Sequence, residues 1–260
     1  MASDISPRAE IDPRATIGDN CKIFPFAYIE GDVVIGDNCI IFPFTSILNG
    51  SRIGNDNKIH QGAVIGALPQ DFDFRGEKSE CVIGNNNIIR ENVVINRATH
   101  RGCQTVIGDN NFLMEGAHIS HDTKVGNHCV FGYGTKIAGD CEIGNGVIFS
   151  SSVIENAGTR VGDLAMIQAG TSFSKDVPPY VIIYGNPVKY GGVNTTMLEV
   201  KGVTEKVQRH IANAYRLIFH GQTSVFDAVN QVKEQVPDSS EIQNLVEFIE
   251  NTKRGIVTKL

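Results

Sequence analysis

The sequence lacks three features that would each point to a different class of protein. It has no excess of basic residues: 23 Lys and Arg stand against 29 Asp and Glu, and the resulting net charge of −6 argues against a nucleic-acid partner. It contains no run of 18 or more apolar residues, so we expect no transmembrane segment. The opening MASDISPRAE has no basic segment leading into an apolar run, so we expect no signal peptide and a cytoplasmic location.

The six cysteines include no CxxC pair, which argues against a zinc or redox motif. Five of them are separated from one another by multiples of six residues, and only Cys103 is out of phase. The five are Cys21, Cys39, Cys81, Cys129 and Cys141. Regular spacing in a reducing compartment favours cysteine as a small apolar filler, and we expect no bound metal or cofactor.

A repeat of six residues dominates the chain. Isoleucine recurs at every sixth position from Ile5 to Ile65, and an apolar residue keeps this phase at most positions as far as Phe173. A period of six matches neither an amphipathic helix nor simple strand alternation, but it is typical of hexapeptide solenoids. The sequence therefore predicts an all-β, left-handed parallel β-helix over 1–190, in which three hexads form one triangular coil and each inward side chain stacks on its copy 18 residues later.

Two polar segments interrupt the repeat, and we expect both to project as loops: one near 66–82 and one near 96–106. Glu155 occupies an inward position, where a lone carboxylate is costly to bury, so we expect that coil to be locally distorted. The repeat ends near Phe173, and the Pro- and Gly-rich stretch that follows is expected not to continue the coil. The second domain is predicted over 191–260.

This second domain has the pattern of a small α-helical bundle. Three amphipathic segments are each preceded by a residue suited to cap a helix. The expected caps are Thr204 for the first, Ser224 for the second, and Asp238 or Ser239 for the third.

The most promising polar cluster is the segment Ala117–Asp122, which contains two histidines and an aspartate. Ile119 holds the inward phase, so His118 and His121 are expected on the outer surface near a corner. Such a histidine is often merely solvated, but an imidazole near its ordinary pKa is also a general base at neutral pH. A neighbouring carboxylate could orient it.

Several further motifs accompany this cluster along nearly the whole chain. They are Pro69-Gln70-Asp71, Ile89-Arg90-Glu91, Ala138-Gly139, Asp176-Val177-Pro178-Pro179-Tyr180, Tyr184-Gly185-Asn186, Gly192-Val193-Asn194 and Asn213-Ala214-Tyr215. With His118-Ile119-x-His121-Asp122, this set resembles the UDP-N-acetylglucosamine O-acyltransferase family, which opens lipid A biosynthesis. The resemblance implies a homotrimer that transfers a (3R)-3-hydroxyacyl chain from acyl carrier protein to the glucosamine 3-hydroxyl of UDP-N-acetylglucosamine, without a cofactor.

The resemblance also implies roles for individual residues. His121 matches the general base, Asp122 the residue that supports it, and Gly139 the glycine whose N–H faces the developing oxyanion. Matches to substrate-binding positions are Gln70, Asp71, His118, Asp140, Asn156, Ala157, Asn194 and Lys201. Ala169 and Pro187 match the end of the acyl groove, where their small size predicts a long donor of about 14 to 16 carbons.

Some of these positions depart from the family pattern. Asp140 and Asn156 stand where histidines are usual, Ala157 replaces a glutamine, and Asp73 stands where a lysine is common. Two other functions stay open at this point. One is another hexapeptide acyl- or acetyltransferase, and the other is a gamma-type, metal-dependent carbonic anhydrase, which uses a wider histidine spacing.

Overall fold

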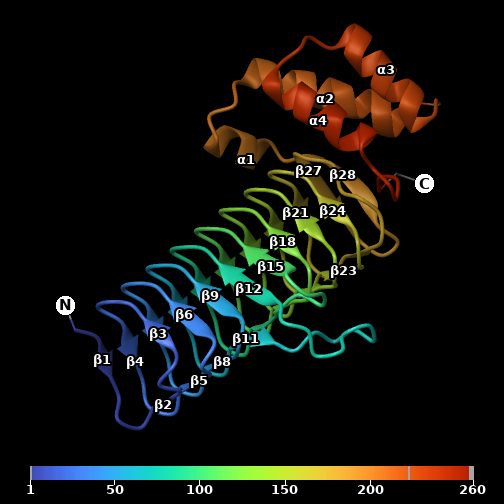
Figure 1. Cartoon of the computed structure of the whole chain (residues 1–260). Helices are drawn as coiled ribbons and strands as arrows, with labels where there is room; N and C mark the ends of the chain where they lie inside the picture. The colour runs from blue at the N-terminus through green and yellow to red at the C-terminus, as the bar shows by residue number, and fades with distance from the viewer. Residues whose placement is uncertain (1, 222, 258–260) are drawn as a thin grey trace.

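The computed structural model describes residues 2–221 and 223–257. Its main body is a triangular prism whose three walls are the sheets A, B and C (Figure 1). The chain passes once through each sheet in every coil, and neighbouring coils pair in parallel, as between Val94 of one coil and His118 of the next. The predicted left-handed parallel β-helix with a helical end is confirmed.

The strands are short because each occupies one wall of a coil. Sheet A contains β1 (Asp4–Ile5), β4 (Lys22–Ile23), β7 (Ile40–Ile41), β10 (Lys58–Ile59), β13 (Ile88–Ile89), β16 (Phe112–Leu113), β19 (Val130–Phe131), β22 (Ile148–Phe149), β25 (Met166–Ile167), β27 (Val181–Tyr184) and β28 (Lys189–Val193). Sheet B contains β2 (Glu10–Ile11), β5 (Tyr28–Ile29), β8 (Ser46–Ile47), β11 (Val64–Ala67), β14 (Val94–Asn96), β17 (His118–Ile119), β20 (Lys136–Ile137), β23 (Ile154–Glu155) and β26 (Ser172–Phe173). Sheet C contains β3 (Thr16–Ile17), β6 (Val33–Ile35), β9 (Ser51–Ile53), β12 (Glu80–Ile83), β15 (Gln104–Ile107), β18 (Lys124–Val125), β21 (Glu142–Ile143) and β24 (Arg160–Val161).

The inward positions of the hexads form the apolar core. Ile95, Ile119 and Ile137 stack in register in sheet B and are fully buried, and full burial of such a side chain contributes roughly 2–3 kcal/mol. The five in-phase cysteines are buried in the corners and Cys103 is exposed, as the spacing predicts. At the corner between sheets C and A, Asp and Asn side chains accept a backbone N–H from the preceding coil, for example Asp163 from Asn145 at 2.6 Å.

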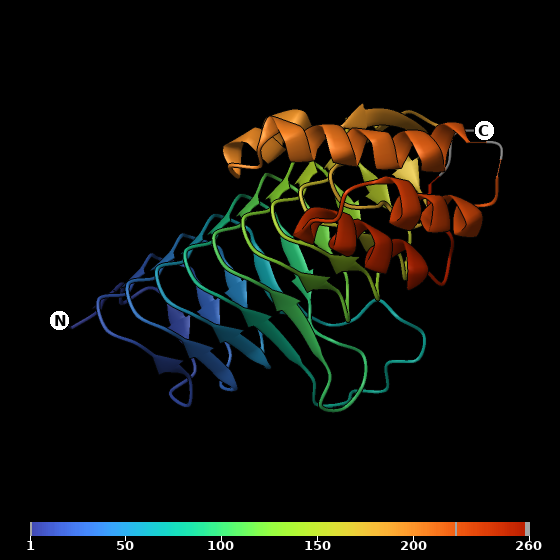
Figure 2. The ribbon, with the colours of Figure 1, turned by 90° about the horizontal axis from the view of Figure 1, so that it is seen from above.

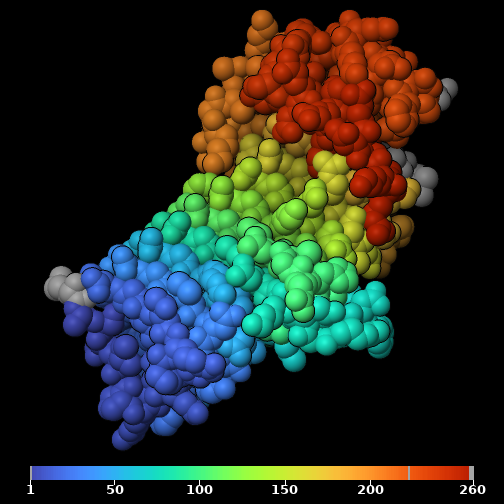
Figure 3. All heavy atoms as spheres, viewed as in Figure 1, coloured from blue at the N-terminus to red at the C-terminus, as the bar shows by residue number. Residues whose placement is uncertain are grey.

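Two irregular segments leave the prism on the same side. Residues 68–79 connect β11 to β12 and form the projecting lobe visible in Figures 2 and 3. Residues 97–103 connect β14 to β15 and lie against this lobe, since the Gly102 N–H donates to Lys78 O at 3.1 Å. Asn96, the last residue of β14, adds a bond from its Nδ2 to Leu68 O at 2.6 Å. Backbone and amide contacts therefore hold the two segments together.

Two expectations about the end of the solenoid are wrong. Glu155 does not distort its coil, because it pairs in regular register between Ile137 and Phe173 while its side chain is fully buried. The Pro- and Gly-rich stretch does continue the wall: Ile183 in β27 pairs in parallel with Ile167 before β28 turns back antiparallel. The apolar segment Val181-Ile182-Ile183 forms this strand although two prolines precede it.

Helices cover the last coils (Figure 1): α1 (Thr195–Val200), α2 (Glu205–His220), α3 (Val225–Gln235) and α4 (Ser240–Glu250). The side chains of Thr204, Ser224 and Ser239 accept N–H bonds at the starts of α2, α3 and α4, which confirms the three caps. The short α1 was not predicted as a separate helix. Among the described residues, no helix has both the length and the apolar character needed to cross a bilayer.

Candidate active site

His121 and several other predicted site residues lie at the corner between sheets B and C, called here the B–C corner. Three successive coils turn there after β17, β20 and β23, and their backbones are linked: Asp140 N–H donates to His121 O at 3.1 Å, and Gly158 N–H donates to Gly139 O at 2.9 Å. The equivalent turn position is held by His121, Gly139 and Ala157. The repeat therefore stacks residues that lie 18 positions apart in the sequence on one edge of the prism.

His121 is only 8 % exposed, although it lies at this outer corner. Its Nδ1 is 2.9 Å from Asp122 Oδ2 and 3.0 Å from Thr99 Oγ1, and its Nε2 is 3.4 Å from Asp71 Oδ2. We assign the proton to Nδ1, because the Asp122 carboxylate can only accept it. Nε2 then carries the lone pair that a general base needs, and it faces away from Asp122.

Asp122 is held in place by the segment 97–103 and by β15, which lies in the preceding coil. Its Oδ2 accepts the Thr99 N–H at 2.9 Å, and its own N–H donates to Thr105 Oγ1 at 2.8 Å. Asp122 also has a left-handed backbone (φ 59°), which Asp tolerates better than most residues. Sequence reasoning missed Thr99 and Thr105, because no motif connects them to the histidine cluster.

Gly139 lies directly against the imidazole. A Cβ at this position would be 2.4 Å from His121 Cε1 and 2.6 Å from Nε2, so only glycine leaves the ring where it is. The backbone hydrogen bonds of the described residues use the Gly139 carbonyl but not its N–H. An amide donor without a protein acceptor, next to a base, is the arrangement that an oxyanion site requires.

Asp71 links the projecting lobe to the B–C corner. It follows Gln70 in the segment 68–79, and its carboxylate faces Nε2 of His121, while its Oδ1 accepts the Asp73 N–H at 2.7 Å. Gln70 is exposed on the same segment. The lobe therefore covers the corner from outside and places an acceptor beside the basic nitrogen.

His118 lies on the outer face of sheet B, in register with Val94 and Lys136. Burial lowers the pKa of its imidazole, and the charges of Lys136 and His121 lower it further. His118 is therefore predominantly neutral at pH 7 and can act as a hydrogen-bond partner.

Asp140, Asn156 and Ala157 share the B–C corner with His121. Asn156 is exposed and its Nδ2 donates to Phe173 O at 2.8 Å, which fixes the side chain to the next coil. Asp140 lines a groove of about 290 Å³ between this corner and the C-terminal segment. The basic side chains in the groove are Arg160, Lys253 and Arg254.

Four predicted site residues lie elsewhere in this single chain. Asn194 is 3 % exposed, and its Nδ2 donates to Leu164 O at 2.8 Å, at the corner between sheets C and A. Lys201 ends α1 and is exposed. Ala169 and Pro187 are exposed, the former at the corner between sheets A and B and the latter between β27 and β28.

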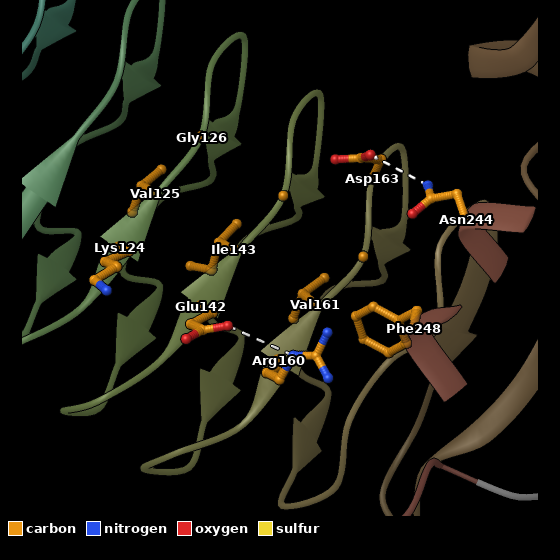
Figure 4. Close-up of a pocket in the computed structure, with 12 residues that line it drawn as sticks. Lys124, Val125, Gly126, Glu142, Ile143, Arg160, Val161, Asp163, Asn244 and Phe248 are labelled. Carbon is orange, nitrogen blue, oxygen red and sulfur yellow. Dashed lines mark hydrogen bonds and ion pairs between the residues drawn. The ribbon is translucent and has the colours of Figure 1, made fainter. Parts of the chain in front are cut away.

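A larger groove, of about 470 Å³, lies between the face of sheet C and α4 (Figure 4). It does not include His121, and its charged and amide side chains other than Lys124 are paired. Arg160 Nε is 3.5 Å from Glu142 and its guanidinium lies over the Phe248 ring, while Asn244 Nδ2 donates to Asp163 Oδ2 at 3.3 Å. These contacts attach the helical domain to the prism.

Comparison with known proteins identifies the family of this chain. Residues 176–257 match the sequence family described as Udp N-acetylglucosamine O-acyltransferase, Domain 2, and residues 14–41 and 104–139 match the bacterial transferase hexapeptide family. The acyl-[acyl-carrier-protein]–UDP-N-acetylglucosamine O-acyltransferase of Halorhodospira halophila is 35 % identical, over 97 % of this chain and 98 % of its own length. The chain belongs to the UDP-N-acetylglucosamine O-acyltransferase family.

Further relatives of this family agree in sequence and in structure. The enzyme of the same name from Xanthomonas euvesicatoria is 40 % identical over 97 % of each chain. A UDP-N-acetylglucosamine acyltransferase structure from Bacteroides fragilis superposes with a TM-score of 0.95 at 48 % identity, over 97 % of this chain and 99 % of its own. The Francisella novicida acyltransferase gives 0.92 at 32 % identity, over 98 % and 94 %.

Proposed function

We propose that this protein transfers a 3-hydroxyacyl chain from acyl carrier protein to the 3-hydroxyl of UDP-N-acetylglucosamine, the first step of lipid A biosynthesis. The observation that carries the proposal is the contact of three groups at the B–C corner: a histidine whose Nε2 is unprotonated when Nδ1 carries the proton, the aspartate that orients it, and a glycine with an unused N–H. Family membership supplies the substrate class. The proposed location is the cytoplasm.

In the proposed reaction His121 Nε2 removes the proton of the sugar hydroxyl as its oxygen attacks the thioester carbonyl carbon. The carbonyl oxygen becomes an oxyanion, which the Gly139 N–H stabilises. Asp122 stabilises the imidazolium that forms. Collapse of the tetrahedral intermediate breaks the C–S bond, and the thiolate takes the proton back from His121.

We propose that the complete site lies between copies of a homotrimer. His121 is at one corner of the prism and the groove-end residues Ala169 and Pro187 belong to other parts of it. A second copy could place its own groove end beside this B–C corner. Both substrates carry phosphate groups, and the groove next to Asp140 offers them the basic side chains of Lys253 and Arg254, since Arg160 is already paired with Glu142.

A comparison of donors and acceptors tests the proposal. The purified protein is incubated with UDP-N-acetylglucosamine or its 3-amino analogue, and with one acyl chain presented either on acyl carrier protein or on coenzyme A. The proposal predicts transfer from acyl carrier protein to the nucleotide sugar. Transfer only from coenzyme A, or bicarbonate formation that a metal chelator abolishes, would contradict it.

A further inference from the structure

Glu155 is a carboxylic acid inside the apolar prism, directly behind the catalytic corner. It holds the inward position of β23 and is fully buried. Phe149 and Val161 hold the inward positions of the same coil in sheets A and C, and Ile137 and Phe173 are its neighbours in sheet B. The hexad pattern calls for an aliphatic residue here, so the carboxyl group needs its own explanation.

The surroundings of Glu155 favour the neutral acid. Its pKa is raised to about 8, chiefly by burial and in smaller part by the charge of Asp176. The hydrogen bonds with Thr159 and Cys141 act in the opposite direction but do not cancel the effect of burial. Within the described part of the chain, Oε2 has no hydrogen-bond partner and Oε1 has one close partner, Thr159 Oγ1 at 2.8 Å.

The Thr159 hydroxyl has one proton but two acceptors at hydrogen-bonding distance. Glu155 Oε1 and the Asn156 carbonyl oxygen are each 2.8 Å from Oγ1. If Glu155 is protonated, its O–H donates to Thr159, and Thr159 donates to Asn156 O. If Glu155 is ionised, Thr159 must turn to the carboxylate, and Asn156 O keeps only the weak Cys141 Sγ donor at 3.4 Å.

This hydrogen-bond chain ends in the backbone that supports Gly139. Glu155 O accepts the Ala138 N–H at 3.0 Å, and the Gly158 N–H donates to Gly139 O at 2.9 Å. Asn156 lies between Glu155 and Gly158 in the chain, and these two residues make the bonds to Ala138 and Gly139. A shift of the Asn156 carbonyl therefore moves the backbone that holds the Gly139 peptide in place.

We propose that Glu155 is a positioning residue for the proposed acyl transfer: as a neutral acid it holds, through Thr159, the corner backbone beneath Gly139, and its ionisation loosens that corner. The inference rests on the proposed function. The other titratable groups around it are Cys141, whose own pKa burial raises to about 12, and Asp176, with Lys136 on the outer face of the adjacent strand and His121 at the neighbouring turn.

The first test measures the proton without using activity. Wild type, Glu155→Gln and Ile137→Val are unfolded at equilibrium from about pH 5 to about pH 9. Between the ordinary value of 4.5 and about 8 the folded protein holds one proton that the unfolded chain has lost, so wild-type stability falls with rising pH. Relative to Glu155→Gln, its unfolding constant should rise about tenfold per pH unit in this window and then level off. The proposal would be overturned if the free energies of unfolding of wild type and Glu155→Gln changed with pH in parallel. Ile137→Val should show the same pH dependence as wild type.

The second test measures kcat/KM of the same proteins against pH, with a carrier-bound donor and UDP-N-acetylglucosamine. Wild type and Ile137→Val should lose activity as pH rises through about 8, whereas Glu155→Gln should not, because its amide still donates but cannot ionise. Glu155→Val lacks the donor and should turn over about tenfold more slowly than Glu155→Gln at neutral pH.

Two results would each overturn the positioning role. One is that kcat/KM of Glu155→Gln falls above about pH 8 as it does in the wild type. The other is that Glu155→Gln and Glu155→Val turn over equally fast. Absence of product with the wild-type protein would instead overturn the proposed function together with that role. The unfolding comparison would still decide whether Glu155 is held protonated, so the two failures are distinguishable.

Discussion

At the scale of single residues, the sequence indicated which side chains matter but not how they touch. The HIxHD motif pointed to His121 and Asp122, and the structure places Asp122 Oδ2 2.9 Å from Nδ1. Thr99 was missed although it contacts both residues, because it reaches them from an irregular segment 22 positions away from His121. Hexad spacing predicts stacking within the coils and says nothing about segments that leave them.

Replacing His121 tests the proposed base. His121→Ala should lower kcat/KM by roughly 10²–10⁴, the usual contribution of a general base. Steady-state kinetics of product formation measure this. The control is His128→Asn, an exposed histidine with a left-handed backbone that Asn also adopts. If kcat/KM of His121→Ala stayed within about threefold of the wild-type value, the assignment of His121 as the base would be contradicted.

Replacing Gly139 tests the contact between glycine and base. The added methyl of Gly139→Ala would come within 2.4 Å of His121 Cε1, so the ring must move, and a displacement of about 1 Å can cost about 10² in rate. Gly31→Ala is the matched control, because the atoms nearest to its Cβ belong to the guanidinium of the flexible Arg14 side chain, which can move away. Equal activity of the two variants would show that the close contact has no role.

At the scale of elements, periodicity predicted the coils and capping residues predicted α2, α3 and α4. The strand β27 and the short helix α1 were missed. The prolines before β27 suggested a break, but parallel pairing with β25 satisfies the backbone all the same. For Glu155 the cost of a buried charge predicted distortion, whereas protonation with a Thr159 partner allows a regular coil.

The attachment of α2 to the last coil can be tested by substitution of Tyr215. Tyr215 is fully buried, and its hydroxyl donates to Pro179 O at 2.5 Å. Tyr215→Phe leaves this carbonyl without its partner and should lower the free energy of unfolding by about 1–3 kcal/mol. Tyr28→Phe, at an exposed tyrosine, should change it by less than about 0.5 kcal/mol. Chemical denaturation measures both, and equal effects would argue against a structural role for the Tyr215 hydroxyl.

At the scale of the whole molecule, the single chain separates groups that the family resemblance assigns to one site. Ala169 and Pro187 are exposed and away from the B–C corner, so their proposed role in ending the acyl groove needs a neighbouring copy. Sequence periodicity describes one prism and carries no information on how prisms associate. This is why assembly stays a prediction.

Acyl-chain length tests that assembly. Ala169→Met should shift preference from a donor of about 14 to 16 carbons towards shorter chains, because each buried methylene contributes roughly 0.8 kcal/mol. Ala169→Gly is the control and should leave the preference for long chains unchanged. The preference is measured by letting carrier-bound donors of different length compete and determining the ratio of their products by mass spectrometry. A wild-type preference for a 10-carbon donor would rule out an open groove at Ala169.

The most direct measurement is the mass and linkage of the product formed from UDP-N-acetylglucosamine and 3-hydroxyacyl thioesters of acyl carrier protein. Wild-type protein should yield the nucleotide sugar bearing one ester-linked hydroxyacyl chain on the glucosamine 3-oxygen, and His121→Ala should yield almost none. Acylation at another oxygen, or equal product from both proteins, would contradict the assignment of His121 as the base.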